Sequence, residues 1–356
     1  MARPDIPDLP SGIKLVYLAE GAANVVYRFD LTEALIPRPT NRPGLPNTED
    51  TTVHEDPGLL QGKLLRLRKD TPANVTYKEI EQNFDTIIRP LFKLHELVNQ
   101  SLVRLPPGLI HHCNERLRAA EESGSRASKR HGTYLSLTEP YGLLITDMTT
   151  YDDPCAHLAE LKPKWLLQSP SAPADAERCR TCALKQMRNA EARRRGQEEQ
   201  RSFCPLSLVS ERFEDVWRAT EYVKGCRDKT RLAEILFRHP VLLRLLSLQK
   251  VHQRVGLEGP PPKTQAMSLD MTLRDCTVYI KIPQDEGSQV EVRLGDLDLK
   301  SSAGGKAQYW RDLETNLIEG GWYHGRDEEA TNDYGCLLQH SKVPAASALL
   351  PQSGFL

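Results

Sequence analysis

The chain has 356 residues, of which 39% are hydrophobic and 27% charged, and its formal net charge is −1. This composition is typical of a folded protein with room for two domains or one large two-lobed fold. The near-zero charge excludes a generally basic nucleic-acid binder, although it allows a local basic pocket. No apolar run is long enough for a membrane span, and the N-terminus has no apolar signal core. We therefore expect an intracellular protein of the nucleus, the cytoplasm or both, with neither nucleic acid nor membrane as a partner.

Residues 14–30 (KLVYLAEGAANVVYRFD) predict two strands joined by a tight turn. The apolar runs are rich in β-branched and aromatic residues, and the turn consists of Gly21, Ala22, Ala23 and Asn24. One interpretation of this turn is a lid whose backbone amides approach nucleotide phosphates, and the other is an ordinary hairpin. Arg66, in the next predicted strand, either supplies a cation to such phosphates or lies on the strand surface.

The rest of this half follows a regular pattern. It predicts a long loop at 36–60, a third strand at 62–70, a helix at 76–98 that Pro90 breaks or kinks, and a buried strand at 141–148. We expect residues 1–148 to form a small α+β lobe.

The character of the chain changes after Thr149. The pattern predicts a charged helix at 175–202, an apolar-rich helical region at 231–255, two strands at 274–282 and 289–300 joined by a polar turn, and a final helix at 307–323. We expect residues 149–356 to form a larger, helix-rich lobe.

Three carboxylates flank the two strands predicted in this second half. Asp275 precedes the first strand, and Asp296 and Asp298 end the second. A hairpin would bring Asp275 and Asp296 together, which suits phosphoryl transfer because one carboxylate orients or deprotonates a hydroxyl and another holds magnesium. Solvated carboxylates at strand ends are the alternative.

Lys162 and Lys164 flank Pro163, which biases the residue before it toward extended backbone. Residues two apart in an extended segment point to the same side, so this pattern predicts two positive charges that project in one direction. A substrate with dense negative charge would explain the pair in a near-neutral chain. A solvated turn is the alternative.

The eight cysteines are scattered, and reduced buried thiols are the default in an intracellular chain. Cys179 and Cys182 have the CxxC spacing, but a zinc site needs about four ligands and no second pair has matching spacing. The segment His111–Cys113 could complete such a site in space. We expect ordinary reduced cysteines rather than structural zinc.

Five motifs occur in order: GAANVVYRF at 21–29, ELKPKW at 160–165, RCRTCALKQM at 178–187, LRDC at 273–276 and GDLDLK at 295–300. Together they resemble the inositol-pentakisphosphate 2-kinase family, its fungal members in particular, over about residues 14–310. The resemblance implies a two-lobed, protein-kinase-like α+β fold. It also implies transfer of the ATP γ-phosphate to the 2-hydroxyl of inositol 1,3,4,5,6-pentakisphosphate, giving inositol hexakisphosphate (phytate), with Mg²⁺ as cofactor. We expect a monomer.

The resemblance further implies roles for individual residues. Asp275 would be the catalytic aspartate, and Asp296 and Asp298 would bind magnesium. The residues that would contact ATP are Gly21, Ala22, Ala23, Asn24, Arg66, Thr146, Asp147 and Met148. The residues that would contact the inositol phosphates are Arg130, Lys162, Lys164, Arg180, Arg188, Lys300, Lys306 and Tyr309.

The chain departs from the family pattern at a few positions. Leu184 stands where plant members carry a histidine, so that contact is absent or replaced by Lys185, and the zinc site of plant members has no clear counterpart. One alternative function is a catalytically inactive inositol-polyphosphate-binding protein, which the presence of Asp275, Asp296 and Arg66 disfavours. Another is a protein kinase, which the missing HRD, DFG and APE signatures disfavour.

Overall fold

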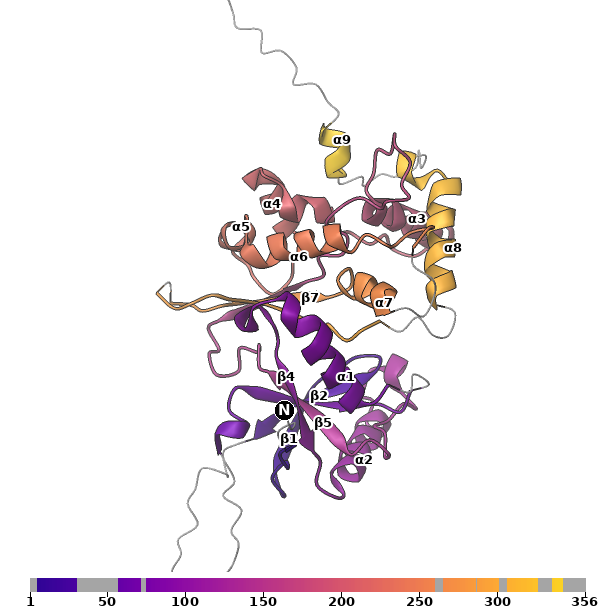
Figure 1. Ribbon diagram of the computed structural model, residues 1–356. Coiled ribbons are helices and arrows are strands. Elements are labelled where there is room, and N and C mark those ends of the chain that lie inside the picture. The colour runs from indigo at the N-terminus through magenta and orange to yellow at the C-terminus, as the bar shows by residue number, and fades with distance from the viewer. Residues whose placement is uncertain are drawn as a thin grey trace, which may run out of the picture. The chain divides into compact units, whose positions relative to one another are not determined.

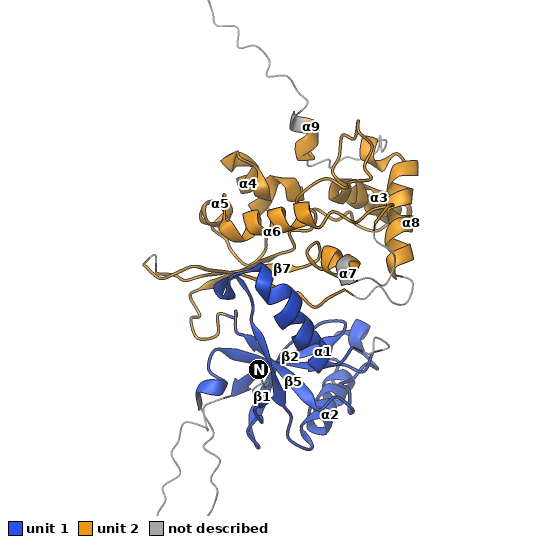
Figure 2. Ribbon diagram, viewed as in Figure 1, with its two compact units in different colours: residues 1–149 blue, residues 150–356 orange. Residues whose placement is uncertain are grey.

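The computed structural model describes residues 5–30, 57–71, 75–259, 265–285, 287–300, 306–325 and 335–341. The chain divides into two compact units, residues 1–149 and 150–356 (Figure 2). Each unit has its own sheet and its own helices, so the mixed α+β class predicted from the sequence is confirmed (Figure 1). In the described residues, every helix is too short or too polar to span a lipid bilayer.

The first unit contains a five-stranded antiparallel sheet in the order β1-β2-β3-β5-β4. Its strands are β1 (Lys14–Glu20), β2 (Asn24–Asp30), β3 (Lys63–Arg68), β4 (Gln100–Arg104) and β5 (Tyr141–Thr146). Its helices are α1 (Tyr77–Asn83) and α2 (Leu109–Glu122). The sequence analysis did not predict β4 or α2. Most of the loop predicted at 36–60 lies outside the described residues.

Alternation of side chains explains the core of this unit. In β2, the residues Val25, Tyr27 and Phe29 are buried and those between them are partly exposed, as the two-residue period of a strand requires. The helix predicted at 76–98 is shorter than expected, because regular α-helix ends at Asn83 and wider and tighter turns follow up to Leu91. Pro90 has no N–H to donate to an α-helical bond, so the change of helix type there has a local cause.

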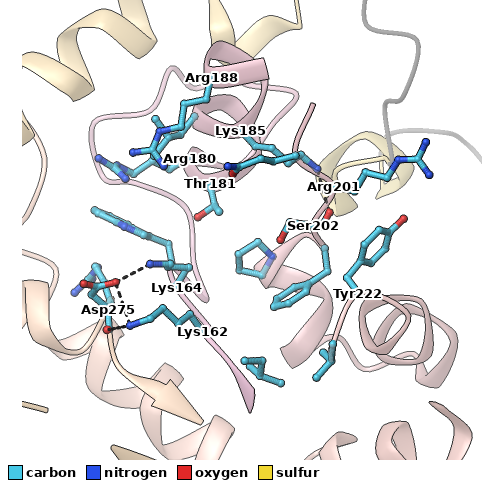
Figure 3. Close-up of a pocket in the computed structure, with 18 of the residues that line it drawn as sticks. Lys162, Lys164, Arg180, Thr181, Lys185, Arg188, Arg201, Ser202, Tyr222 and Asp275 are labelled. Atoms are coloured by element: carbon cyan, nitrogen blue, oxygen red, sulfur yellow. Dashed lines mark hydrogen bonds and ion pairs between the residues drawn. The ribbon is translucent and has the colours of Figure 1, made fainter. Parts of the chain in front are cut away.

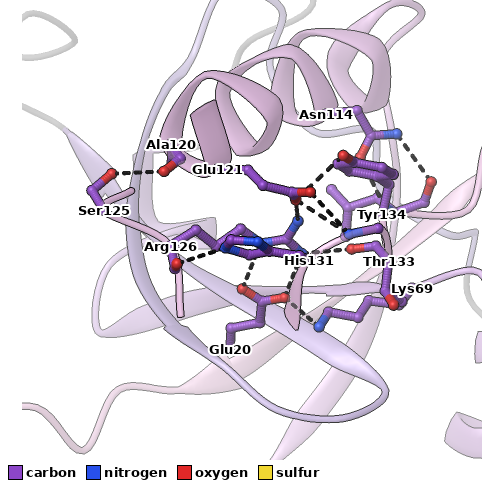
Figure 4. Close-up of polar contacts among 12 residues, drawn as sticks. Glu20, Lys69, Asn114, Ala120, Glu121, Ser125, Arg126, His131, Thr133 and Tyr134 are labelled. Carbon is purple, nitrogen blue, oxygen red and sulfur yellow. Dashed lines mark hydrogen bonds and ion pairs between the residues drawn. The ribbon is translucent and has the colours of Figure 1, made fainter. Parts of the chain in front are cut away.

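A buried ionic network fixes the turn between β1 and β2 (Figure 4). Glu20 forms ion pairs with Lys69 and, at 2.7 Å, with Arg126, and Lys69 also donates to the Gly21 carbonyl at 3.0 Å. Burial alone would raise the pKa of Glu20, but hydrogen bonds from Arg126 and Lys69 outweigh it and hold the pKa below its ordinary value. All three side chains are almost fully buried, so the turn rests on a rigid base.

The second unit contains a three-stranded antiparallel sheet, β6-β7-β8, and several helices. The strands are β6 (His157–Leu161), β7 (Thr277–Ile282) and β8 (Glu291–Gly295). The helices are α3 (Arg180–Arg194), α4 (Phe213–Thr220), α5 (Lys229–Leu236), α6 (Pro240–Val251), α7 (Gln265–Thr272), α8 (Lys306–Glu319) and α9 (Leu337–Ser341). The predicted hairpin and final helix are confirmed, whereas the charged helix is shorter than predicted.

One fully buried side chain, Gln249 on α6, joins the backbone segment around Lys164 to the segment around Leu273. Its amide nitrogen donates to the carbonyls of Lys164 and Leu273, both at 2.8 Å, and its oxygen accepts from the Leu166 amide at 2.9 Å. These segments lie outside regular strands and helices, so their backbone groups need partners from elsewhere. A single amide satisfies three of them and fixes the distance between the two segments.

We expect Gln249→Leu to lower the free energy of unfolding of the protein by about 3 kcal/mol, because it leaves two buried backbone groups and one partly buried backbone group without this partner. Urea denaturation followed by circular dichroism measures this change. Gln253→Leu, an exposed position just beyond α6, is the matched control and should change the free energy by less than about 0.5 kcal/mol. Equal effects of both substitutions would contradict the role of Gln249.

Candidate active site

The sheet of the second unit gathers the candidate site at one end. Thr277 pairs with Gly295 across β7 and β8, so Asp275 and Asp296 leave the hairpin at the same end, as predicted. On the other side of β7, Leu161 pairs with Val278, so the chain after β6 leaves the sheet at that end as well. This register brings Lys162 and Lys164 to the two aspartates across more than a hundred residues of sequence.

Three lysines pair with the two aspartates. Figure 3 shows two of them, Lys162 and Lys164, with Asp275. Lys162 Nζ lies 2.7 Å from Asp296 Oδ2 and 3.9 Å from Asp275 Oδ1. Lys164 Nζ lies 2.6 Å from Asp275 Oδ1, and Lys300 Nζ lies 3.3 Å from Asp275 Oδ2. Asp275 is therefore surrounded by positive charge.

Electrostatics at this cluster favour the ionised forms. Burial alone would raise the pKa of Asp275, but the hydrogen bond from Lys164 and the charges of Lys300 and Lys162 outweigh it and lower the pKa below its ordinary value. Burial alone would lower the pKa of Lys162, but Asp296 and Asp275 outweigh it and raise the pKa. At neutral pH, Asp275 is thus a carboxylate that accepts hydrogen bonds.

Two residues of the cluster have a backbone conformation that side chains disfavour. Lys164 has φ of +53° and Asp296 has φ of +58°, both in the left-handed region. The sequence-based picture of an extended Lys162–Pro163–Lys164 segment is therefore wrong at Lys164, although both ammonium groups do point toward Asp275. Such strain is typical of functional sites, where the surrounding structure fixes it.

A cavity of about 840 Å³ opens beside this cluster, entirely within the second unit. Its lining includes nine basic residues and two acidic ones. The basic residues are Lys162, Lys164, Arg180, Lys185, Arg188, Arg201, Lys224, Arg274 and Lys300, and the acidic ones are Glu160 and Asp275. A chain with almost no net charge thus concentrates positive charge around one hollow, which favours an anionic ligand.

Aromatic stacking and a buried acid position two of these arginines. The guanidinium carbons of Arg180 and Arg274 lie 4.4 Å and 4.7 Å from the centroid of the Trp165 ring. Arg180 Nε also donates to Glu314 at 2.6 Å, and Glu314 is fully buried. Burial lowers the pKa of Arg274 to about 10, which still leaves it charged at neutral pH.

The remaining predicted phosphate-contacting residues differ in position. Arg188 on α3 and Tyr309 on α8 line the cavity, as do Lys162, Lys164, Arg180 and Lys300. Lys306 begins α8 and is exposed, but it is not part of the lining. Arg130 belongs to the first unit, at the end of a short 3₁₀ helix.

Asp298 contacts the residues around the site through its backbone carbonyl. Its carbonyl accepts from the Thr272 hydroxyl at 3.3 Å, and the same hydroxyl accepts from the Lys300 amide at 2.9 Å. Thr272 is fully buried, so it fixes the segment that follows Asp296.

The residues predicted to contact a nucleotide all lie in the first unit. Gly21, Ala22 and Ala23 form the turn before Asn24, whose carbonyl accepts from the Gly21 amide at 2.9 Å. Arg66 on β3 lies with its guanidinium carbon 5.7 Å from the Tyr77 ring centroid. At the end of β5, the amides of Thr146 and Asp147 donate to the carbonyls of Asn99 and Gly62, and the next residue, Met148, is buried.

Several cavity residues were not singled out from the sequence. Arg274 could have been found, because it lies next to Asp275 in the LRDC motif, and Lys185 was named only as a substitute for a missing histidine. Thr181 lies within the RCRTCALKQM motif but was not singled out, and Arg201 and Tyr222 belong to no motif. Their place around the cavity depends on how α3 and the segments after it pack (Figure 3).

The fold and this cavity define a class: a mixed α+β protein with a cationic pocket beside paired aspartates, suited to a small, highly phosphorylated ligand. Comparison with known proteins agrees. The family model described as inositol-pentakisphosphate 2-kinase matches residues 17–316. The chain is also 30% identical over 352 residues to an inositol-pentakisphosphate 2-kinase of Yarrowia lipolytica, covering 92% of this chain and 96% of that protein. The chain therefore belongs to the inositol-pentakisphosphate 2-kinase family.

We expect Lys164→Met to raise the pKa of Asp275, because it removes the nearest compensating charge. Carboxyl ¹³C chemical shifts followed against pH measure the pKa, with Asp275→Asn identifying the resonance. The ionised carboxylate contributes stability that is present above the ordinary value of 3.8 and is lost as the pH falls through the lowered pKa, so the variant should lose this contribution at a higher pH.

Lys185→Met is the matched control for this titration, because the Lys185 ammonium donates to the Ser202 carbonyl instead, at 3.2 Å. It removes one positive charge from the same cavity without removing a partner of Asp275. An unchanged pKa of Asp275 in Lys164→Met would contradict the electrostatic interpretation.

Proposed function

We propose that this protein transfers the γ-phosphate of ATP to the 2-hydroxyl of inositol 1,3,4,5,6-pentakisphosphate, giving inositol hexakisphosphate. The observation that carries the proposal is the cavity with nine basic residues that opens directly onto Asp275. A ligand with five phosphates needs several cations at once, and a lone basic patch for a single phosphate would not need so many. Family membership supports the same ligand.

The two kinds of cation in the cavity serve different purposes. Arginine grips two phosphate oxygens in a fork, whereas lysine acts as a compact point charge. A cation about 4 Å from a phosphate charge gains roughly 4 kcal/mol at an effective dielectric near 20, before desolvation is counted. Contacts from several directions would fix the orientation of the ring and direct one hydroxyl toward Asp275.

Asp275 is proposed as the catalytic residue. Its lowered pKa keeps it ionised, so it accepts the hydrogen bond of the attacking hydroxyl and then its proton as the phosphate bond forms. Its three lysine partners, Lys162, Lys164 and Lys300, can also bind the substrate. When phosphates enter the cavity, these ammonium groups can shift from the aspartates to the phosphate oxygens. Because these ion pairs are partly exposed to water, breaking them costs little free energy.

Asp296 and Asp298 are proposed to hold Mg²⁺. Magnesium is commonly bound by one or two carboxylates together with substrate phosphates. The Asp296 carboxylate lies just after β8 and shares Lys162 with Asp275, and Asp298 follows two residues later in the chain. The ion would neutralise charge on the nucleotide phosphates during transfer. The Lys162 ammonium forms an ion pair with Asp296 at 2.7 Å, and the metal ion would replace it as the partner of that carboxylate.

The first unit is proposed to bind ATP, with the two units as the lobes of a protein-kinase-like fold. The Gly21–Asn24 turn would cover the phosphates, and its base at Glu20 is rigid. The amides of Thr146 and Asp147 are already used within the unit, so the proposed donor to adenine is the Met148 amide. Every group in this scheme comes from one chain, so a monomer suffices.

Asp275→Asn should reduce turnover by about 10²–10⁴-fold, the usual contribution of a general base. Anion-exchange separation of the products after incubation with ATP, magnesium and the pentakisphosphate measures it. Binding of the pentakisphosphate, measured by calorimetry, should persist. Asp285→Asn, in the exposed turn between β7 and β8, is the control and should keep full activity. A wild-type protein that binds the ligand without turnover would support the inactive binding protein instead.

Lys162→Met and Lys164→Met should each weaken pentakisphosphate binding by about 10- to 100-fold, since a hydrogen bond to a charged group contributes about 1.5–3 kcal/mol. Their effect on ATP binding should be much smaller. Isothermal calorimetry with each ligand measures both affinities. Lys250→Met, an exposed lysine at the end of α6, should change neither. Equal losses for the two ligands would show that the cavity is not the inositol-phosphate site.

A further inference from the structure

Tyr77, the first residue of α1, is fully buried and contacts two residues that the proposed function assigns to the nucleotide. Its hydroxyl donates to Asn24 Oδ1 at 3.0 Å, and its ring centroid lies 5.7 Å from the guanidinium carbon of Arg66. Asn24 is the last residue of the turn between β1 and β2, whereas Arg66 lies on β3. One side chain of the helix therefore joins two separate parts of the proposed ATP site.

The register of the sheet explains why both residues face this helix. Asn24 pairs with Arg68, which lies two residues beyond Arg66 on β3. Directly paired residues share a face of an antiparallel sheet, as do residues two apart in one strand, so these three side chains lie on one face. Arg66 also pairs with Leu143, which belongs with Tyr77 to one buried cluster. The face that α1 covers is thus the face that carries Asn24 and Arg66.

The start of α1 is itself fixed, so Tyr77 has a defined position. The backbone amide of Tyr77 donates to Glu139 Oε2 at 3.0 Å, and Glu139 lies just before β5. The Thr76 hydroxyl caps the helix by accepting from the Glu79 amide at 3.3 Å. These bonds satisfy backbone donors that an α-helix leaves free at its first turn, and the first of them attaches the helix to the sheet.

The alternative is an ordinary core tyrosine, since a buried tyrosine hydroxyl usually finds a partner. Tyr27 on β2 is such a residue, because it is buried in the cluster that α2 covers on the other face of the sheet. Tyr77 differs because its hydroxyl bonds a side chain of the turn while its ring lies against the cation of another strand, within the range of a cation–π contact. Arg66 Nη2 also donates to Gln100 Oε1 at 3.4 Å, so the guanidinium is held by more than the ring.

We propose that Tyr77 is a positioning residue for ATP, which keeps Asn24 at a fixed distance from Arg66 so that the turn and the cation meet the same nucleotide phosphates. This inference rests on the proposal that the first unit binds ATP. The ionic network at Glu20 fixes the beginning of the turn, and Tyr77 fixes its end. Tyr77 acts through Asn24 and Arg66.

The test is Tyr77→Phe in the full-length protein, which keeps the ring against Arg66 and removes only the hydroxyl. Calorimetry with ATP and magnesium, and separately with the pentakisphosphate, measures both affinities. We expect the Kd for ATP to rise about 3- to 10-fold, the usual effect of losing one neutral hydrogen bond, and the Kd for the pentakisphosphate to stay within about twofold. Tyr27→Phe is the matched control and should change neither affinity.

A double-mutant cycle with Asn24→Ala tests the route of the effect. In the Asn24→Ala background, Tyr77→Phe should have almost no further effect on the Kd for ATP, because the hydrogen bond is already absent. An unchanged ATP affinity in Tyr77→Phe, an equal loss for the two ligands, or an undiminished loss in the Asn24→Ala background would overturn this inference and leave the proposed function standing. A wild-type protein that does not bind ATP would overturn both.

Discussion

Repulsion among positive side chains is the constraint on which the second unit depends. Nine basic residues surround one cavity in a chain of net charge −1, and without compensation they would push its walls apart. The structure supplies three kinds of compensation. Asp275 and Asp296 form ion pairs with three lysines, and the buried Glu314 forms one with Arg180. The Trp165 ring lies against both Arg180 and Arg274. The cavity is thus kept ready for an anion that can replace part of this internal pairing.

Much of the positioning comes from uncharged buried groups rather than from the charged residues themselves. Gln249 bonds the backbone of Lys164, of Leu166 and of Leu273, the first residue of the LRDC motif. Thr272 bonds the backbone of Asp298 and Lys300. The segments around Lys164 and Asp296 are irregular, and these two residues have left-handed backbone. Buried hydrogen bonds with well-defined geometry can hold such strained segments in place, whereas half-exposed ion pairs would be too weak to do so.

In the first unit, buried ion pairs rather than uncharged groups fix an irregular segment, the turn between β1 and β2. Its Gly21–Asn24 turn has a single glycine, and a Cβ added to Gly21 would meet the Asn24 carbonyl at an ordinary 3.8 Å. The shape of the turn therefore does not depend on glycine. It depends on Lys69 and Arg126, which fix Glu20 at the end of β1, and on the bond from Lys69 to the Gly21 carbonyl. The turn can keep its position in this way without a glycine-rich sequence.

Sequence alone determined the features that act over a few residues: the strand alternation of β2, the hairpin that joins Asp275 and Asp296, the break near Pro90, and the ordered motifs that mark the family. Tertiary structure decided the contacts that join distant segments, such as Gln249 with Lys164, Arg201 and Tyr222 with the cavity, and Cys204 and Cys336 with the CxxC pair. The reason is physical. Alternation and turn chemistry follow from local backbone geometry, whereas a contact between residues more than twenty or a hundred positions apart exists only once helices and strands have packed against one another.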